Sequence, residues 1–398
     1  MRGVMPPFLP PLRLVGADVL TGDAFAAHAV GISHGQIVDL PGGAEVDLSG
    51  YWLLPGIIDL HGDGFERQMF PRPSAPFPLK DGLASTAREA AAHGVTTAFL
   101  AQSWSWEGGF RGPDHAEAVM SAVQEFRQSA LVDLRVQVRA ETHLVDAVPR
   151  LIAAVEQFRV GYVVFNDHLE EGFQMHRRNP DGFGHWARKA GLTEVQLLTR
   201  MEAARAKARD VPRALCMMAG AFDRLGITYG SHDDPDAETR EVYRMIGAKV
   251  AEFPTTRRAA AAARAAGDPV IMGAPNVVRG GSQAGNIAAV ELIRDGLCDA
   301  LVSDYHIPAL PLAVWALVDQ GILPLASAWR LVSEGPAQVL GLVDRGVLTT
   351  GLRADLVAIH RDSRAIEMVI AGGRMAHLSG EAAARFCAMA GAARMAAE

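Results

Sequence analysis

LLPGIIDLHGDGFERQMFPRP, residues 53–73, begins as an apolar run typical of a buried β-strand and then breaks into polar residues and glycines. His61 and Asp63 stand two positions apart at this break, and side chains two apart on a strand point to the same side. Burying an imidazole and a carboxylate costs free energy unless both are paired. The end of this strand therefore predicts a binding site to which other residues contribute.

Further apolar runs of the same kind follow, and alanine-rich helical patterns separate most of them. Near-continuous apolar strands that alternate with helices indicate a parallel sheet covered on both faces. Eight strands over about 250 residues predict an α/β fold of the closed (β/α)8, or TIM-barrel, type. The segment 171–210 is longer than a connection needs, so we expect an insertion that contains a helix. The expected strands are 54–60, 94–101, 133–141, 161–167, 226–232, 247–253, 269–275 and 298–305.

Both ends of the chain carry short strand patterns, within residues 12–52 and 346–378. Strands from opposite ends of a chain can pair, so we expect a small β-sandwich domain built from both chain ends. In the expected division, residues 1–52 and 341–380 form the two parts of this domain, 53–340 form the barrel, and 381–398 form a helical tail.

The composition argues against several classes of protein. The chain has 398 residues, a net charge of −7 and three cysteines, Cys216, Cys298 and Cys387. The negative charge argues against nucleic acid as a partner, and the absence of a run of roughly 18 apolar residues argues against a membrane span. Widely spaced cysteines, together with prolines where a signal peptide needs an apolar core, favour a cytoplasmic protein. The sequence leaves open whether the chain forms a homo-oligomer.

Histidine, aspartate or glutamate side chains, all of which can bind metal, follow five of the expected barrel strands. Any one of them has an ordinary explanation, such as a hydrogen-bonded histidine or an aspartate that caps the next helix. A barrel, however, brings its strand ends to one mouth, where catalytic groups gather. Imidazole and carboxylate are ligands of divalent cations, so the set together predicts a metal site. Its members are His61, Asp63, Glu141, His168, His232 and Asp304, with Asp233 and Asp234 beside them.

The predicted cofactor is a divalent metal, one or two ions, with zinc favoured over manganese or iron. Glu141 is the candidate for a ligand shared between two ions. Asp304 is the candidate for the base that takes a proton from the attacking water. In the alternative, Asp304 only binds metal and Asp233 or Asp234 takes the proton. Most other histidines, His185 among them, do not follow a strand end and are expected to be structural or on the surface.

The metal-ligand positions belong to longer motifs that resemble a known family. LPGIIDLHGD (54–63) is similar to the opening motif of the amidohydrolase superfamily, with Asp63 where that superfamily has a second histidine. Five further blocks resemble the α-D-ribose 1-methylphosphonate 5-triphosphate diphosphatases of the carbon–phosphorus lyase pathway, the PhnM-like proteins. These blocks are MFPRP (69–73), GSHDD (230–234), AEFPTT (251–256), MGAPNVVRGGSQAGN (272–286) and SDY (303–305).

The resemblance implies hydrolysis of a small phosphorylated substrate to a 5-phosphate plus pyrophosphate, with His61, Asp63, Glu141, His168, His232 and Asp304 as the metal and catalytic set. It is not complete, because the family usually has a histidine in place of Gln283, and SDYYP in place of SDYHIP at His306. These departures affect the expected substrate more than the expected reaction.

A triphosphate needs positive charge and backbone donors, and the sequence around residue 280 offers both. Arg279 can pair with phosphate oxygens, and the glycines after it let backbone N–H groups face an anion. The expected substrate-binding residues are Arg279, Gly280, Gly281, Ser282, Arg72 and Asn276. An ordinary turn and surface arginines are the competing explanation. Two other functions remain open: hydrolysis of a C–N bond by a deaminase, cyclic amidase or deacetylase, and ligand binding without catalysis.

Overall fold

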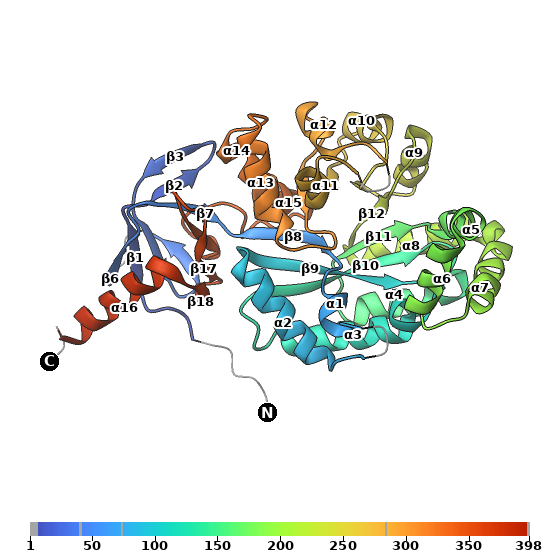
Figure 1. Ribbon diagram of the computed structural model, residues 1–398, viewed down its shortest axis with the longest axis horizontal. Coiled ribbons are helices and arrows are strands. Elements are labelled where there is room, and N and C mark those ends of the chain that lie inside the picture. The colour runs from blue at the N-terminus through green and yellow to red at the C-terminus, as the bar shows by residue number, and fades with distance from the viewer. Residues whose placement is uncertain (1–6, 40–41, 73–74, 283–284, 396–398) are drawn as a thin grey trace.

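The computed structural model describes residues 7–39, 42–72, 75–282 and 285–395, and its centre is an eight-stranded parallel barrel (Figure 1). Each barrel strand pairs with the next one along the chain. The predicted α/β barrel is confirmed, and each expected strand has its counterpart. The strands are β8 (Ile57–Gly62), β9 (Val95–Trp104), β10 (Asp133–Glu141), β11 (Tyr162–Asn166), β12 (Thr228–His232), β13 (Val250–Glu252), β14 (Val270–Gly273) and β15 (Ala300–Val302).

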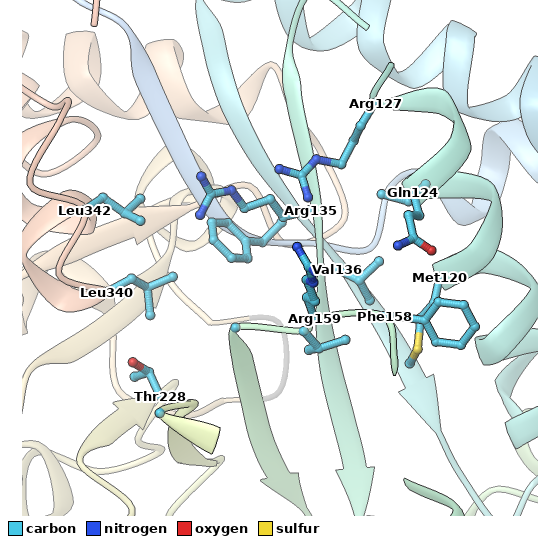
Figure 2. Close-up of a pocket in the computed structure, with 15 residues that line it drawn as sticks. Met120, Gln124, Arg127, Arg135, Val136, Phe158, Arg159, Thr228, Leu340 and Leu342 are labelled. Atoms are coloured by element: carbon cyan, nitrogen blue, oxygen red, sulfur yellow. The ribbon is translucent and has the colours of Figure 1, made fainter. Parts of the chain in front are cut away.

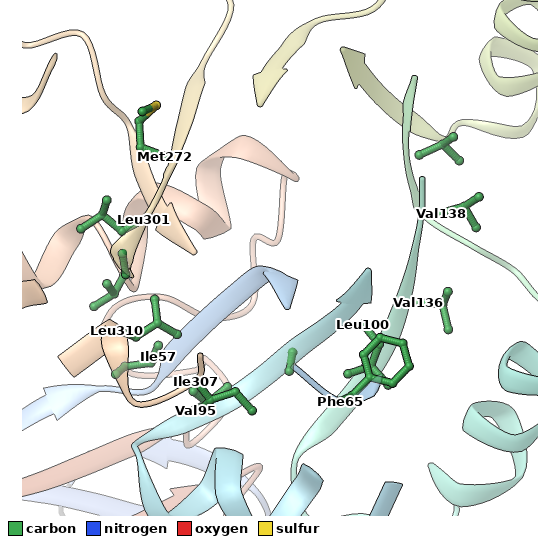
Figure 3. Close-up of a cluster of buried hydrophobic side chains, with 14 of the residues drawn as sticks. Ile57, Phe65, Val95, Leu100, Val136, Val138, Met272, Leu301, Ile307 and Leu310 are labelled. Carbon is green, nitrogen blue, oxygen red and sulfur yellow. The ribbon is translucent and has the colours of Figure 1, made fainter. Parts of the chain in front are cut away.

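Helices cover the outside of the barrel, so its strands are buried on both sides. On β8, Ile57 packs outward, whereas Ile58 and Leu60 fill the interior. Figure 3 shows outward-facing members of this core, Val136 and Val138 of β10 among them. This double burial explains why the strands read as unbroken apolar runs. The surrounding helices are α2 (Leu79–Ala92), α3 (Pro113–Phe126), α4 (Val148–Gln157), α8 (Val211–Leu225), α9 (Ala237–Met245), α10 (Arg257–Ala265), α12 (Ala289–Arg294) and α13 (Ala309–Asp319).

Shorter elements join these strands and helices. They are α1 (Glu66–Met69), α11 (Ala274–Arg279), α14 (Leu325–Arg330), α15 (Glu334–Val339) and the 3-10 turns η1 (Gly109–Arg111), η2 (Val145–Ala147) and η3 (Ala208–Asp210).

Hydrogen bonds between the first and last strands close the barrel. The Asp63 N–H donates to the Asp304 carbonyl at 2.8 Å, and the Asp304 N–H donates to the His61 carbonyl at 2.9 Å. Below them, Ser303 donates from its N–H and its hydroxyl to Asp59. A Cβ at Gly62 would lie 2.8 Å from both the Asp59 carboxylate and the Ser303 hydroxyl, so this approach requires glycine. Closure places both predicted ligands of β8 beside Asp304.

The small domain is a β-sandwich of two sheets, one from the N-terminal part alone and one that combines strands from both ends of the chain. One sheet has the order β5-β4-β1-β6 and the other β18-β17-β16-β7-β2-β3. The strands are β1 (Leu12–Val15), β2 (Asp18–Thr21), β3 (Ala24–Ala27), β4 (Val30–Ser33), β5 (Gln36–Val38), β6 (Ala44–Asp47), β7 (Tyr51–Pro55), β16 (Leu356–His360), β17 (Ile366–Ala371) and β18 (Arg374–Leu378). Residues 54 and 55, expected in the first barrel strand, instead pair with β16 in this domain.

Two helical parts complete the molecule. The predicted insertion contains three helices (Figure 1): α5 (Leu169–Arg178), α6 (Pro180–Lys189) and α7 (Glu194–Ala206). They pack around a buried cluster that also includes Trp106 from outside the insertion. Helix α16 (Gly380–Met395) lies on the small domain through Ala382 and Phe386. None of the helices in the described ranges is long and apolar enough to span a membrane.

Candidate active site

Three side chains form a buried group at the carboxyl ends of β8, β12 and β13. One oxygen of Glu252 lies 2.9 Å from Nδ1 of His61 and 2.8 Å from Nδ1 of His232. The two imidazole rings stack with their centroids 5.3 Å apart, and Phe253 contacts both rings edge-on. Because Glu252 binds both Nδ1 atoms, it fixes the ring orientations and leaves each Nε2 to face another partner.

The free ring nitrogen of His61 supports a cation site. Nε2 of His61 is buried and has no hydrogen-bond partner within the described part of the chain. A buried polar atom without a partner is costly, and a bound ion would satisfy it. Two groups with no shared member each place three ligand atoms within 4.8 Å of one another. The first is His61, Asp63 and Asp304, and the second is His168, His232 and Asp233.

The charges of these groups favour a cation too. Burial, and then the neighbouring charge of Asp63, raise the pKa of Asp304 to about 6. Burial lowers the pKa of His232, so its ring is held neutral, which is the form that binds metal. The three carboxylates and three imidazoles of these groups are a donor set that suits divalent ions.

Backbone strain gathers in the same place. Asp233, Phe253 and Asp304 each follow a barrel strand and have left-handed φ angles of 59°, 53° and 53°. Residues other than glycine rarely adopt this conformation, and it costs of order 1–3 kcal/mol at each position. The strain turns the chain sharply at the strand ends, which lets Asp233 and Asp304 reach the mouth.

Glu141 lies beside this set but makes different contacts from the predicted ones. Its Oε1 lies 2.5 Å from Nδ1 of His168, and its Oε2 accepts from the His168 backbone N–H and the Trp106 indole, both at 3.3 Å. None of the groups of ligand atoms found among the described residues includes Glu141. Its contacts are those of a residue that orients His168, and its role as a shared ligand stays a prediction.

Arg139 is a mouth residue that the strand-end reasoning missed. Its guanidinium lies 3.6 Å from Oδ2 of Asp63 and 3.3 Å from Nε2 of His232. With the Asn166 side-chain amide turned so that its oxygen and nitrogen change places, the oxygen accepts two hydrogen bonds from the Arg139 guanidinium, both at 3.2 Å. Arg139 lies within β10 and not at its end, but its side chain is long enough to reach the mouth.

The mouth opens into a cavity of about 760 Å³. Part of its wall comes from the insertion, through Met175, His185 and Trp186. The Trp186 indole donates to the buried carboxylate of Glu107, which ties α6 to the barrel. His185 was expected to be structural or on the surface because it follows no strand. It reaches the cavity only because the insertion folds over the mouth.

The residues expected to bind phosphate lie outside the lining of this cavity. Arg279 ends the short helix α11 and donates to the Tyr305 hydroxyl at 3.4 Å, close to where β15 ends. Asn276 ties α11 to α12, because its side-chain oxygen accepts from the Ala289 N–H. Gly280 ends α11 with φ 75°, as an ordinary turn requires.

The remaining members of the predicted set are also away from the metal groups. Gly281 donates its N–H to the Asn276 carbonyl, and Ser282 follows it. Arg72 is exposed, and its carbonyl accepts from the Ala75 N–H. Gln283 lies outside the described residues, and His306 follows the last strand. The phosphate-binding role of these residues therefore stays a prediction.

Comparison with known proteins identifies the family. The chain is 34% identical over 336 residues to the α-D-ribose 1-methylphosphonate 5-triphosphate diphosphatase of Escherichia coli K12, and the match covers 81% of this chain and 87% of that protein. The chain belongs to this diphosphatase family. No family model matches the sequence.

Solved structures show that the diphosphatase-family chain has the amidohydrolase fold. One is a β-aspartyl dipeptidase from Fervidobacterium islandicum AW-1, with a TM-score of 0.62, 15% identity and coverage of 93% of this chain and 97% of that one. An amidohydrolase matches with a TM-score of 0.63, 14% identity and coverage of 93% and 100%. N-acetylglucosamine-6-phosphate deacetylase of Pasteurella multocida matches with a TM-score of 0.58, 13% identity and coverage of 92% and 99%. The chain is therefore a hydrolase with the fold of amidohydrolases.

Proposed function

We propose that this enzyme hydrolyses α-D-ribose 1-methylphosphonate 5-triphosphate to the 5-phosphate and pyrophosphate, in phosphonate catabolism. The observation that carries this proposal is the 34% identity to the E. coli enzyme over 81% of the chain. The mouth of the barrel supports it, because its ligand-type groups and its arginine suit a reaction at a polyphosphate.

His61, Asp63 and Asp304 would hold one divalent ion, and His168, His232 and Asp233 would hold a second beside it. Zinc is the proposed metal. A bound divalent ion supplies Lewis-acid chemistry, which activates water near neutral pH and draws negative charge from phosphoryl oxygens.

The chain's own side chains perform the remaining steps. Asp304 lies at the base of the mouth, where it accepts the proton of the attacking water, while Glu252 and Glu141 keep the histidine rings in place. Arg139 offers a planar fork of donors to phosphate oxygens. His185 and Trp186 of the insertion form part of the cavity wall in which the substrate would lie.

Phosphorus-31 NMR of the metal-loaded enzyme with this triphosphate tests the proposal. The expected products are the 5-phosphate and pyrophosphate in equal amounts. Release of inorganic phosphate one group at a time would mean that a different anhydride bond is cleaved. Intact triphosphate beside fully metal-loaded protein would contradict the proposal and favour hydrolysis of a C–N bond.

A further inference from the structure

A second cavity, of about 480 Å³, lies at the opposite end of the barrel from the mouth. It sits where β10, β11 and β12 begin, whereas the metal-ligand residues follow the ends of barrel strands. Figure 2 shows the side chains of Arg127, Arg135 and Arg159 directed into this space, with Leu340 and Leu342 across from Gln124. No part of the proposed reaction uses this cavity.

The cavity carries an excess of positive charge. Arg127 and Arg135, which line the cavity, both pair with the carboxylate of Asp133, at 3.3 and 2.8 Å. Asp133 is also shared with Arg345, at 2.9 Å, although Arg345 has a second partner in Asp344. Arg159 has neither a hydrogen bond nor an ion pair from its side chain to any described residue. Three arginines thus line the cavity near one shared carboxylate, which makes it a local basic site in a chain with a net charge of −7.

The backbone at Arg159 adds an independent observation. Arg159 follows α4 with a left-handed φ of 52°, at the turn that leads into β11. At the corresponding helix-to-strand turns before β9, β12, β14 and β15 the chain has Gly94, Gly226, Gly267 and Gly296, all with positive φ. Glycine suits this conformation without strain. Keeping an arginine here places a long cationic side chain in the cavity despite an unfavourable backbone angle.

Apolar and aromatic side chains form another part of the wall, beside the polar Gln124 and Thr228. Leu340 and Leu342 line one side, and the ring of Phe99 lies under the Arg135 guanidinium at 5.5 Å from its centroid. The volume falls in the range of small-molecule sites, which is roughly 300–1,000 Å³. Arg127 and Arg159 are exposed, so a ligand can enter from solvent.

We propose that this cavity binds a small organic anion. Its phosphate or carboxylate group would pair with the guanidinium forks of Arg127 and Arg159, and its apolar or ring part would lie against Leu340, Leu342 and Phe99. Planar guanidinium groups bind both kinds of anion in bidentate fashion. The site is separate from the mouth, so the proposal does not depend on the reaction proposed above.

Isothermal titration calorimetry with phenyl phosphate, benzoate and inorganic phosphate tests the site. The purified enzyme is expected to bind phenyl phosphate or benzoate more tightly than inorganic phosphate, and whichever binds better identifies the anionic group. Gln124→Glu adds a carboxylate to the cavity wall with almost no change of shape. Arg159→Gln removes one cation. Each of these two variants is expected to weaken binding of the probe about tenfold, because each makes the cavity less positive by one charge near the ligand.

Gln128→Glu is the matched control, because it makes the same change four residues away at a position outside the lining. It is expected to bind the probes like the unaltered enzyme, and all three variants are expected to keep the hydrolytic activity at the mouth. Two results would overturn the proposal: no binding of phenyl phosphate or benzoate to the unaltered enzyme at millimolar concentration, or equal binding by Gln124→Glu and Gln128→Glu.

Discussion

Glu252 sets the orientation of two predicted metal ligands at once, because a single oxygen of its carboxylate contacts Nδ1 of both His61 and His232. Its other oxygen accepts from Gln137 at 2.8 Å and from the Tyr162 hydroxyl at 3.2 Å. The negative charge of Glu252 is thus fully surrounded by donors. At the residue scale, the site depends as much on these supporting contacts as on the ligand atoms.

Replacing Glu252 by glutamine tests this dependence. A glutamine oxygen cannot accept from both rings with the strength of a carboxylate, so metal affinity should fall about 10- to 100-fold. Tyr162→Phe is the matched control, since it removes only one donor to Glu252 and should change the affinity far less. Equal metal affinities for Glu252→Gln and the unaltered enzyme, measured by competition with a chelator, would contradict the account.

Asp304 gives a prediction about pH. Burial and the charge of Asp63 raise its pKa to about 6 in the metal-free fold, above the usual 3.8. The folded state therefore binds more protons than the unfolded chain between these pH values, and this group lowers stability as pH rises from 4 to 6. Asp304→Asn removes the buried charge, so it should stabilise the metal-free protein at pH 8 by roughly 1–3 kcal/mol while abolishing activity.

Denaturant unfolding of the metal-free protein at pH 4 and pH 8 measures this effect. The exposed Asp362 provides the control, because Asp362→Asn should leave the pH dependence unchanged. A metal-free Asp304→Asn variant that is less stable than the unaltered chain at pH 8 would show that the Asp304 charge does not destabilise the fold.

Arg139 places a cation between the two proposed ion positions, close to Asp63 and to His232. Arg139→Gln should strengthen metal binding, because it removes a repulsive charge, and should raise KM for the triphosphate, because it removes a phosphate partner. Metal titration and steady-state kinetics separate these two effects. Weaker metal binding in the variant would mean that Arg139 supports the ligands and does not compete with the metal.

Sequence reasoning located most of this neighbourhood but not all of its contacts. His61, Asp63, His232 and Asp304 end their strands, and their position there was enough to single them out. Arg139 was missed because it lies inside a strand, and the contact of one Glu252 oxygen with two histidines depends on the spacing of β8, β12 and β13. Such contacts depend on the closed barrel and not on a local pattern of residues.

At the scale of elements, the insertion between β11 and β12 decides how the mouth is covered. Glu107 joins it to the barrel, because its carboxylate accepts from the Trp186 indole and pairs with Arg111 at 3.1 Å, and its carbonyl accepts from Arg200. The sequence predicted an insertion with a helix. It could not predict how the helices α5–α7 lie over the mouth, because that placement depends on contacts such as these between distant segments.

Glu107→Ala tests whether these contacts hold the insertion in place. The substitution leaves Arg111 without its buried partner and frees Trp186, so the insertion should become more sensitive to proteolysis and KM should rise severalfold. Glu170→Ala is the control, since it breaks only an exposed ion pair with Arg177 inside the insertion; such pairs contribute little. Identical digestion of both variants would mean that Glu107 does not anchor the insertion.

At the scale of the whole molecule, the barrel and the small domain form a continuous structure. Strand β7 leads directly into β8, and its five residues pair with β16 from the other end of the chain. The buried Trp329 of the barrel donates to the Pro55 carbonyl at 2.9 Å. The alternation of strands and helices predicted the barrel from sequence alone. The predicted start of the first barrel strand was too early, because residues 54 and 55 are apolar and would suit either the barrel or the small domain.

A truncation after residue 345 tests this continuity. It removes β16–β18 and would expose the buried Leu53 and Leu54 of β7, so the remaining chain should be insoluble or lack a cooperative thermal transition. Removal of residues 390–398 is the control, because it keeps Ala382 and Phe386, the buried contacts of α16. A truncated chain that melts cooperatively near the temperature of the full chain would show that the barrel is stable alone.

We expect metal held at the barrel mouth to drive cleavage of the triphosphate. The most direct test measures bound metal and pyrophosphate release in the same samples of chelator-treated enzyme, as zinc is added back, for the unaltered chain and for His61→Ala. Activity is expected to rise in proportion to bound metal, and His61→Ala is expected to lose both metal and activity while staying folded. Full activity in the metal-free enzyme, or undiminished metal binding and turnover in His61→Ala, would contradict it.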